Sequence, residues 1–345
     1  MSTIPPTMRA WVFNKAGTPE NVLKFNPAHP TPAPPSGSNV LVRIYYAALS
    51  SAGTNLMNNV PSILRRSAIP ELDFSGFIAQ AGEKAPPELS PGTAVFGTVP
   101  VLSSVLRGVG TLAAYISLPA ENVIVKPKTV GLPEAAGLTS LANTAMLMLE
   151  KAKIKAGDRV LVHGGGGDVG MVALQASRSV GAAVVATCSE SKMNMVLQLG
   201  AEKTIDYRAS QPLHKFLVDN YGLQQFDIIF DTVGSQDLFE HSPRYLKPDG
   251  VYVNVGGVGI STALSLWRWF KNSAHPGLLG GIPRKFIMFN TVPTKQRGEK
   301  IAALAAEKSI DILVDSTFKL EDALLGYKRM LDGKRNGRCL IEISS

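Results

Sequence analysis

Five glycines in seven residues, in the segment GGGGDVG at 164–170, constrain the fold of this chain more than any other feature. An apolar run typical of a short strand, VLVH at 160–163, precedes them, and a helical apolar pattern follows. The spacing G-x-G-x-x-G at 165–170 lets a backbone turn tightly and approach a pyrophosphate, while the start of the next helix offers N–H groups to it. The segment therefore predicts a dinucleotide-binding turn rather than a merely flexible loop.

Strands and helices alternate regularly after this turn. Apolar strand patterns recur at 182–189, 203–208, 226–234 and 250–257, and helical patterns lie among them. Such alternation predicts a parallel sheet with helices on both faces, because each crossover between parallel strands needs a connecting helix.

The sequence pattern outside this region is different. Residues 1–125 are rich in strand and turn patterns, and from residue 286 strand and helix patterns are mixed. A chain of 345 residues suits two domains. We therefore expect a nucleotide-binding domain at 126–285, inserted into a catalytic domain formed by 1–125 and 286–345.

The end of the second strand indicates which nicotinamide cofactor binds. An acidic residue that holds an adenosine ribose is expected about 20 residues after the glycines, and Ser189 stands there instead, with Lys192 close behind. A small neutral residue beside a lysine suits a 2′-phosphate, which needs donors and a positive charge, and Tyr207 can add a hydroxyl from the neighbouring loop. This pattern favours NADPH, although Lys192 could be a solvated first-turn lysine and Glu190 could hold a free ribose and favour NAD.

An acid inside the glycine turn is the unexpected part of the pattern. Asp168 would repel a pyrophosphate if its carboxylate pointed inward. At the first position of a helix, an outward-facing acid is favoured by the helix dipole. We therefore predict that Asp168 points away from the phosphates. The residues of the turn that we expect to bind the cofactor are Gly165, Gly166, Gly167, Asp168, Val169 and Gly170.

These motifs resemble the cofactor half of the medium-chain dehydrogenase/reductases, and in particular their zinc-independent, quinone-oxidoreductase-like branch. The stretch from GDRVLVHGGGGDVG to EKTIDYR at 157–208, the strands FDIIFDTVGS and LKPDGVYVNVGG, and the ending LGYKRMLDGKRNGRCLIEI carry the resemblance, which covers nearly the whole chain. It implies an α/β fold in which a Rossmann doubly wound parallel sheet is inserted into a β-rich GroES-like catalytic domain. It also implies that Thr144, Asn254 and Gly256 lie near the cofactor, although Thr144 could equally be a helix-interior threonine that bonds its own turn.

The positions that hold zinc in related alcohol dehydrogenases lack zinc ligands here. No histidine precedes Asp73 in the segment IPELDFSGFI, and the segment AALSSAGTN at 47–55 contains no cysteine. The five histidines show no ligand-like spacing with one another or with a cysteine, and the two cysteines are far apart. Because a catalytic zinc needs three protein ligands, we expect no bound metal.

The activity implied by the resemblance is hydride transfer from NADPH to a quinone or an α,β-unsaturated carbonyl. The segment that matches the family's active-site strand and loop offers Tyr46, Ser50 and Asn55 as candidate catalytic residues. Tyr45 and Tyr46 alternate along one strand, so at most one of them faces the cleft, and each could be only a packed aromatic. The alternatives are a biosynthetic enoyl or carbonyl reductase that acts in trans in secondary metabolism, and a non-catalytic NADPH-binding sensor.

Composition limits the classes of partner that the protein is expected to bind. The formal charge is +8, yet no long basic run exists, so nucleic-acid binding is not expected. No apolar run reaches the roughly 20 residues that span a bilayer, and two cysteines fit a reducing compartment. We expect a cytoplasmic homodimer that acts on a small molecule. The segment around Trp267 and Trp269 could be a substrate lid, a subunit contact or a membrane-facing patch, and a subunit contact is the simplest interpretation.

Overall fold

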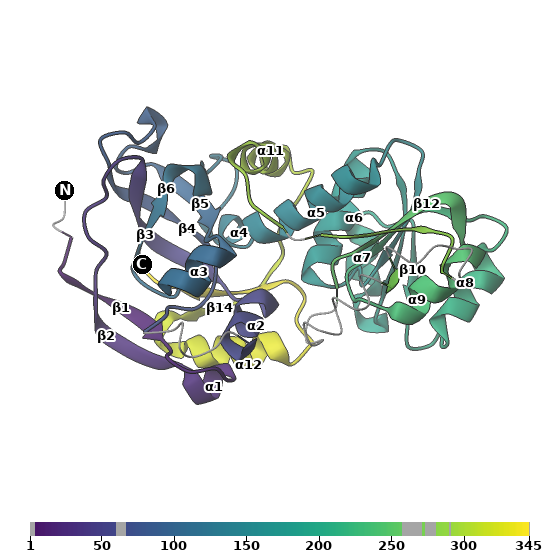
Figure 1. Ribbon diagram of the computed structural model, residues 1–345, viewed down its shortest axis with the longest axis horizontal. Coiled ribbons are helices and arrows are strands. Elements are labelled where there is room, and N and C mark those ends of the chain that lie inside the picture. The colour runs from purple at the N-terminus through teal and green to yellow at the C-terminus, as the bar shows by residue number, and fades with distance from the viewer. Residues whose placement is uncertain (1–3, 60–66, 257–270, 273–280, 290, 345) are drawn as a thin grey trace. The chain divides into compact units, whose positions relative to one another are not determined.

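The computed structural model describes residues 4–59, 67–256, 271–272, 281–289 and 291–344. It contains two compact units, shown in Figure 1. The first comprises Met1–Asn143 with Val292–Ser345, and the second comprises Thr144–Thr291. The Trp267 and Trp269 segment lies outside the described residues.

The second unit is built on a six-stranded sheet whose strands are all parallel. The order places the first of these strands, β8, in the middle, as in a doubly wound nucleotide-binding sheet. The fold class expected from the alternation is therefore confirmed. In spatial order the strands are β10 (Lys203–Asp206), β9 (Ala183–Cys188), β8 (Arg159–His163), β11 (Phe226–Asp231), β12 (Leu246–Asn254) and β13 (Lys285–Met288).

Helices connect these strands and explain their burial. Four of the five residues of β8 and five of the six residues of β9 are buried, as expected for parallel strands that are covered on both faces. A core of Leu161, Phe226, Ile229 and Tyr252, among others, packs within this unit. The connecting helices are α6 (Asp168–Ser179), α7 (Met193–Gln198), α8 (Leu213–Tyr221) and α9 (Gln236–His241).

The first unit combines the two ends of the chain in one mixed, seven-stranded sheet. Its spatial order is β14 (Val314–Lys319), β15 (Arg338–Glu342), β3 (Asn39–Ala48), β4 (Asp73–Ala81), β5 (Ala94–Thr98) and β7 (Val123–Val125), and β6 (Tyr115–Pro119) also pairs with β3. Among the described strands of this sheet, only β14 and β15 pair in parallel. A separate hairpin joins β1 (Thr7–Val12) to β2 (Lys24–Pro30).

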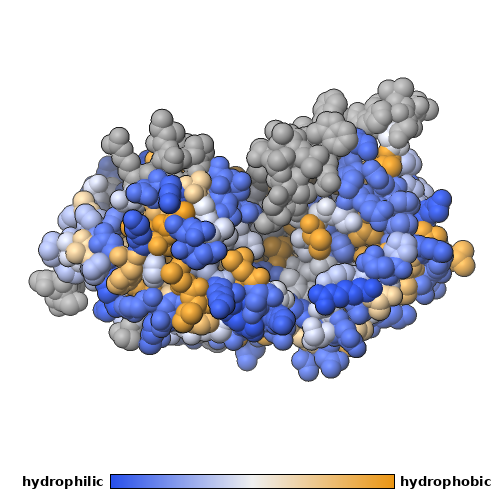
Figure 2. All heavy atoms as spheres, turned by 90° about the horizontal axis from the view of Figure 1, so that it is seen from below, coloured by the Kyte–Doolittle hydropathy of each residue, from blue (hydrophilic) through white to orange (hydrophobic). Residues whose placement is uncertain are grey.

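Short helices complete this unit. They are α1 (Pro19–Val22), α2 (Ser51–Asn59), α3 (Val101–Arg107), α4 (Leu132–Ala136), α11 (Lys295–Ala306) and α12 (Ala323–Leu331), while α5 (Thr139–Ala152) runs across the limit between the units. No helix among the described residues is both long and apolar enough to cross a membrane. Hydrophilic residues dominate the face shown in Figure 2, where hydrophobic residues form scattered patches.

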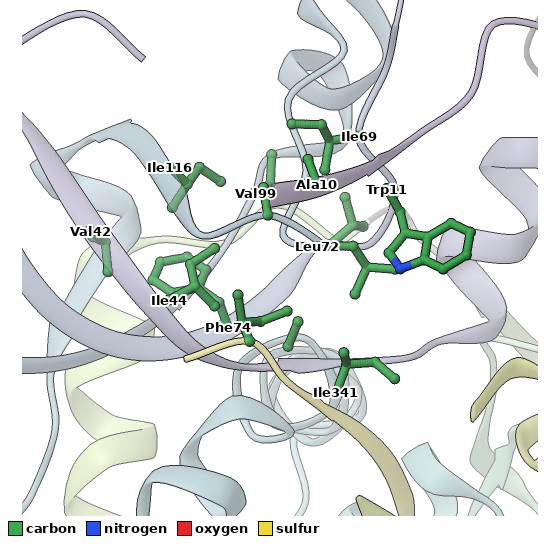
Figure 3. Packing of buried hydrophobic residues seen from close by; sticks show 14 of the residues in the cluster. Ala10, Trp11, Val42, Ile44, Ile69, Leu72, Phe74, Val99, Ile116 and Ile341 are labelled. Atoms are coloured by element: carbon green, nitrogen blue, oxygen red, sulfur yellow. The ribbon is translucent and has the colours of Figure 1, made fainter. Parts of the chain in front are cut away.

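The core of the first unit joins segments that lie far apart in the sequence. Figure 3 shows Trp11 of β1, Ile44 of β3, Phe74 of β4 and Ile341 of β15 in one buried cluster. The Trp11 indole Nε1 donates a hydrogen bond of 2.6 Å to the carbonyl of Leu320. The closing segment is therefore an integral part of the unit that the N-terminal residues begin.

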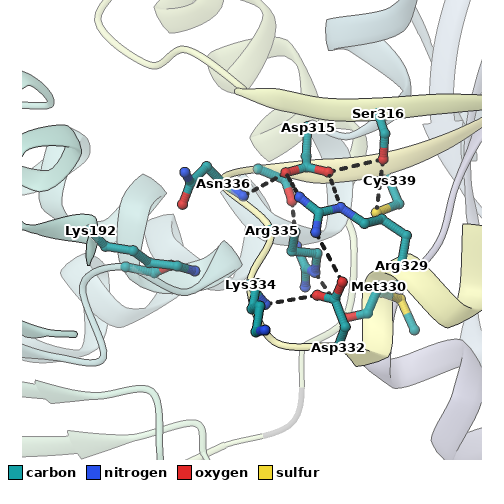
Figure 4. A network of polar contacts seen from close by, with 12 residues as sticks. Lys192, Asp315, Ser316, Arg329, Met330, Asp332, Lys334, Arg335, Asn336 and Cys339 are labelled. Carbon is teal, nitrogen blue, oxygen red and sulfur yellow. Dashed lines mark hydrogen bonds and ion pairs between the residues drawn. The ribbon is translucent and has the colours of Figure 1, made fainter. Parts of the chain in front are cut away.

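A partly buried arginine reinforces the closing segment. Arg329 of α12 donates to both carboxylate oxygens of Asp315 at 2.8 Å and to Asp332 at 2.9 Å (Figure 4). The backbone N–H of Asn336 donates to the Asp315 carboxylate as well, at 2.8 Å. These contacts fix α12 against β14 and the loop that leads into β15.

Candidate active site

The glycine turn forms a close-packed cradle between β8 and α6. Gly167 is the N-cap of α6 and, being a glycine, has no side chain that could cap the helix. A Cβ atom at Gly170 would collide with the carbonyl of Gly164, so helix and turn approach as closely as backbones can. The start of a helix presents N–H groups and the positive end of the helix dipole, and such a start suits an anion. The turn thus fits the pyrophosphate of a dinucleotide.

Lys192 lies across this turn. Its Nζ donates a 2.9 Å hydrogen bond to the carbonyl of Gly166, and a Cβ at Gly166 would sit 2.8 Å from its Cδ. Lys192 is partly buried, whereas Glu190 is exposed. The Lys192 side chain is therefore held against the turn, unlike that of a first-turn lysine that extends into solvent.

Hydroxyl groups gather at the ends of the two neighbouring strands. Ser189 follows β9, where its Oγ lies 3.3 Å from that of Ser191. Tyr207 follows β10, and its amide donates to the carbonyl of Cys188 at 3.2 Å, so Ser189 and Tyr207 leave adjacent positions of the sheet. Arg208, which the sequence interpretation did not select, donates from Nε to the Tyr207 hydroxyl at 3.2 Å. Its position just after the end of β10 could have identified Arg208 from the sequence.

A polar network supports the turn from behind. Thr187 Oγ1 accepts the amide of Gly164 at 3.0 Å and lies 2.7 Å from Nδ1 of His163. Because that hydroxyl already accepts the amide, its own hydrogen is available to Nδ1. Burial lowers the pKa of His163, and the nearby Asp231 opposes this shift. His163 is therefore a neutral support of the turn.

The ends of β11 and β12 form the other side of the cradle region. The buried Asp231 carboxylate accepts the amides of Val233, Gly234 and Ser235 at 2.8–2.9 Å. Asn254 accepts the amide of Gly256 at 2.7 Å, and a Cβ at Gly256 would collide with the 233–234 backbone. The structure thus brings Asn254 and Gly256 to the strand ends where doubly wound folds bind ligands. Asp231 was missed, although an acid directly after the apolar run FDIIF was a signal.

Thr144 belongs to a helix and not to a strand end. It lies inside α5, is partly exposed, and is the first residue of the second unit.

The candidate catalytic residues belong to the first unit. Tyr46 of β3 packs against Ala48 and Leu340, and burial, with a contribution from Glu342, raises its pKa. Tyr45 instead forms an edge contact with Phe77 at 4.9 Å between ring centroids, so the two tyrosines have different environments.

Ser50 and Asn55 lie close together along the chain at α2. The Ser50 hydroxyl caps α2 by accepting the amide of Gly53 at 2.9 Å, and it donates to Glu71 Oε2 at 2.8 Å. Asn55 is a partly exposed residue of the same helix. The structure thus brings these two candidates to one helix. Sequence reasoning overlooked Glu71.

Asp73, at the position that resembles the zinc region of related enzymes, pairs with a cation of the protein itself. It accepts from Ser140 and lies 3.4 Å from Nη2 of Arg338, and both members of this ion pair are buried. Burial raises the pKa of Asp73, while Arg338 opposes the shift. This carboxylate therefore has a hydrogen-bond donor and a cation of the protein itself as its partners.

One histidine cluster escaped the sequence analysis. Ligand atoms of His214, Asp237 and His241 lie within 4.8 Å of one another in the second unit. His214 Nδ1 lies 2.7 Å from Asp237, and the two imidazole rings stack with centroids 3.9 Å apart. No sequence spacing joins His214 to the other two residues, because they belong to different helices. The expectation that no metal binds stays a prediction.

The fold defines a two-unit protein with a doubly wound sheet of the dinucleotide-binding type, and comparison with known proteins gives its family. Residues 169–280 match the family model described as "Zinc-binding dehydrogenase". The medium chain reductase pydE of Acremonium sp. is 34% identical, with 98% of this chain and 99% of the relative covered. The trans-enoyl reductase poxH of Penicillium oxalicum is 28% identical, with 98% of each chain covered. The chain belongs to the medium-chain dehydrogenase/reductase superfamily.

Solved structures share the same fold. The quinone oxidoreductase from Coxiella burnetii superposes with a TM-score of 0.79 at 23% identity, over 98% of this chain and 99% of that one. An NAD-dependent alcohol dehydrogenase superposes with a TM-score of 0.80 at 25% identity, over 98% and 100% of the two chains. The predicted resemblance is confirmed, and the protein is an oxidoreductase of this superfamily.

Proposed function

We propose that this protein is an NADPH-dependent, zinc-independent reductase of α,β-unsaturated carbonyls or quinones. The observation that carries the proposal is the position of Lys192, which lies across the glycine turn. Ser189, three residues earlier, stands where an NAD site would place an acid. In this proposal residues 126–285 form the cofactor domain, and residues 1–125 with 286–345 form the catalytic domain. A bound NADPH would supply the hydride.

The chain's own residues have distinct proposed roles. The turn at 165–170 holds the pyrophosphate, and Asp168 points away from it. Ser189, Lys192 and Tyr207 bind the 2′-phosphate, and Arg208 adds a second positive charge there. Asn254, Gly256 and Thr144 position the nicotinamide side of the cofactor.

The catalytic unit would stabilise charge on the acceptor. When a hydride adds to an enone or a quinone, negative charge develops on the carbonyl oxygen, and donors aimed at that oxygen accelerate the reaction. Ser50, Tyr46 and Asn55 are the proposed donors. We further propose that the enzyme acts as a cytoplasmic homodimer.

A second candidate function follows from the names of the relatives. Two of them, from Penicillium oxalicum and Aspergillus terreus, are trans-enoyl reductases at 28% and 29% identity. An enoyl thioester is an α,β-unsaturated carbonyl, so the same site could reduce such a group in secondary metabolism. A non-catalytic NADPH sensor is the remaining alternative.

A panel of acceptors separates these functions. Purified protein is mixed with NADPH and a quinone, an enone or an enoyl thioester, and oxidation of NADPH is followed at steady state. We expect turnover with at least one acceptor class, and the best acceptor decides between the two reductase functions. Tight NADPH binding without turnover on any acceptor would establish the sensor instead.

The variant Lys192→Ala tests the cofactor assignment. We expect the affinity for NADPH to fall about tenfold to a hundredfold, because a charge-assisted hydrogen bond contributes about 1.5–3 kcal/mol. The affinity for NADH should change little, since NADH has no 2′-phosphate. Fluorescence titration measures both constants. Unchanged NADPH affinity would refute the assignment.

A further inference from the structure

A sealed carboxyl group lies beside one of the proposed donors. Glu71 is 1% exposed and stands in the loop before β4, with a backbone φ of +69°. Residues other than glycine rarely adopt this left-handed conformation, and where they do, the surrounding structure must enforce it, often at a functional site. The position therefore prompts the question of what the Glu71 side chain does.

Residues of two helices, α2 and α12, enclose this carboxyl group. Ser50 donates to Oε2 at 2.8 Å from the start of α2, and Tyr327 of α12 donates to Oε1 at 2.7 Å. The backbone of Gly53 presses against the group so closely that a Cβ there would collide with the carboxylate oxygens. Only a glycine at position 53 leaves room for the Glu71 side chain.

Burial brings the pKa of Glu71 close to neutral pH. Burial raises the pKa of Glu71 to about 7, with a smaller contribution from Asp73, while Tyr327, Ser50 and Arg338 oppose the shift. Burial and Glu71 together hold the pKa of Tyr327 well above its ordinary value, so its phenol keeps its hydrogen and can donate it to Glu71.

The Ser50 hydroxyl has one hydrogen to give, and Glu71 decides where it goes. Its oxygen already accepts the amide of Gly53, and an ionised Glu71 can only accept, so it takes the serine hydrogen. A protonated Glu71 instead donates to the serine oxygen, and the serine hydrogen can then point elsewhere. Ser50 keeps 8% exposure, whereas Glu71 and Tyr327 keep 1% each, so Ser50 is the most exposed residue of the three.

We propose that Glu71 is a positioning residue that directs the Ser50 hydroxyl, so that Ser50 donates to the acceptor's carbonyl oxygen only while Glu71 carries a proton. The inference rests on the proposed reductase function and deepens it. It makes the reductase depend on pH through a group that never touches the substrate.

The variant Glu71→Gln is the central test. With the Tyr327 hydroxyl donating as it does to Glu71, the amide oxygen of the glutamine should face it and the NH₂ group should face Ser50, which releases the serine hydrogen at every pH. We measure kcat with NADPH and the best acceptor from pH 5.5 to 9. The wild-type rate should fall above about pH 7. The variant should lose this fall and, relative to pH 6, retain at least about tenfold more of its activity at pH 8.5.

A second variant shifts the transition rather than removing it. Tyr327→Phe deletes a hydrogen bond that lowers the pKa of Glu71, so the fall in rate should move upward by about half a pH unit or more. Tyr245→Phe is the matched control, because Tyr245 is an equally buried tyrosine whose hydroxyl donates to the Leu238 carbonyl in the other unit. The control should leave the midpoint unchanged.

The outcomes separate the two levels of the proposal. A rate profile that keeps its shape in both Glu71→Gln and Tyr327→Phe, even with lower stability or lower overall activity, overturns the role of Glu71 alone. Absence of turnover in the unaltered protein with every acceptor overturns the reductase function and this inference with it.

Discussion

The substitution Gly170→Ala is expected to abolish measurable NADPH binding and to destabilise the second unit by about 1–3 kcal/mol. The added Cβ would meet the carbonyl of Gly164, which is backbone and cannot rotate away. Turn and helix must therefore separate, and the amides of the turn lose the spacing that a pyrophosphate requires. Fluorescence titration with NADPH and chemical unfolding measure the two effects.

The control for this substitution is Gly157→Ala in the same unit. Gly157 has a φ of +84°, and an added Cβ would meet no atom within 4 Å, so the change costs strain without a collision. We expect a loss of about 1 kcal/mol and an unchanged affinity for NADPH. If Gly170→Ala bound NADPH as tightly as this control, the turn would not be the pyrophosphate cradle.

Arg338→Met is expected to lower the free energy of unfolding by about 3–5 kcal/mol at neutral pH, because it leaves the buried Asp73 without its cation. Both side chains of the pair are 1% exposed. Without Arg338, which lowers the pKa of Asp73, that pKa should rise further. The folded variant then holds a proton that the unfolded chain releases, so its stability should fall as the pH rises above the ordinary range for aspartate.

Urea unfolding between pH 5 and 8 checks both the magnitude and the sign. Arg329→Met is a matched control, since Arg329 also pairs with aspartates but is 34% exposed, and its loss should be much smaller. Adding Asp73→Asn to Arg338→Met should restore part of the stability. A loss of stability that does not depend on pH would contradict the buried ion pair as its cause.

Local sequence patterns were sufficient for the second unit. The strands around Val160, Val184 and Ile228 are continuous apolar runs because a parallel sheet is covered on both faces. The glycine turn, Ser189, Lys192 and Tyr207 each follow directly from one strand, so their sequence distance from a strand end places them at one edge of the sheet. Arg208 and Asp231 obey the same rule and could have been selected with it.

Local sequence patterns did not predict the long-range contacts of the first unit. Ser50 could be selected by resemblance, yet its partner Glu71 is 21 residues away and Tyr327 a further 256. Asp73 and Arg338 are 265 residues apart, and His214 meets Asp237 only because α8 and α9 lie together. No periodicity or spacing encodes these contacts.

The sequence by itself determined the doubly wound sheet, because that depends on periodicity, and its motifs indicated the superfamily by resemblance; the cofactor edge that they predict stays a prediction. The tertiary structure alone decided the partners of the buried charges, above all the enclosure of Glu71 by Ser50, Gly53 and Tyr327. The physical reason is that a buried charge is satisfied by whatever donors the packing of distant elements brings within about 3 Å.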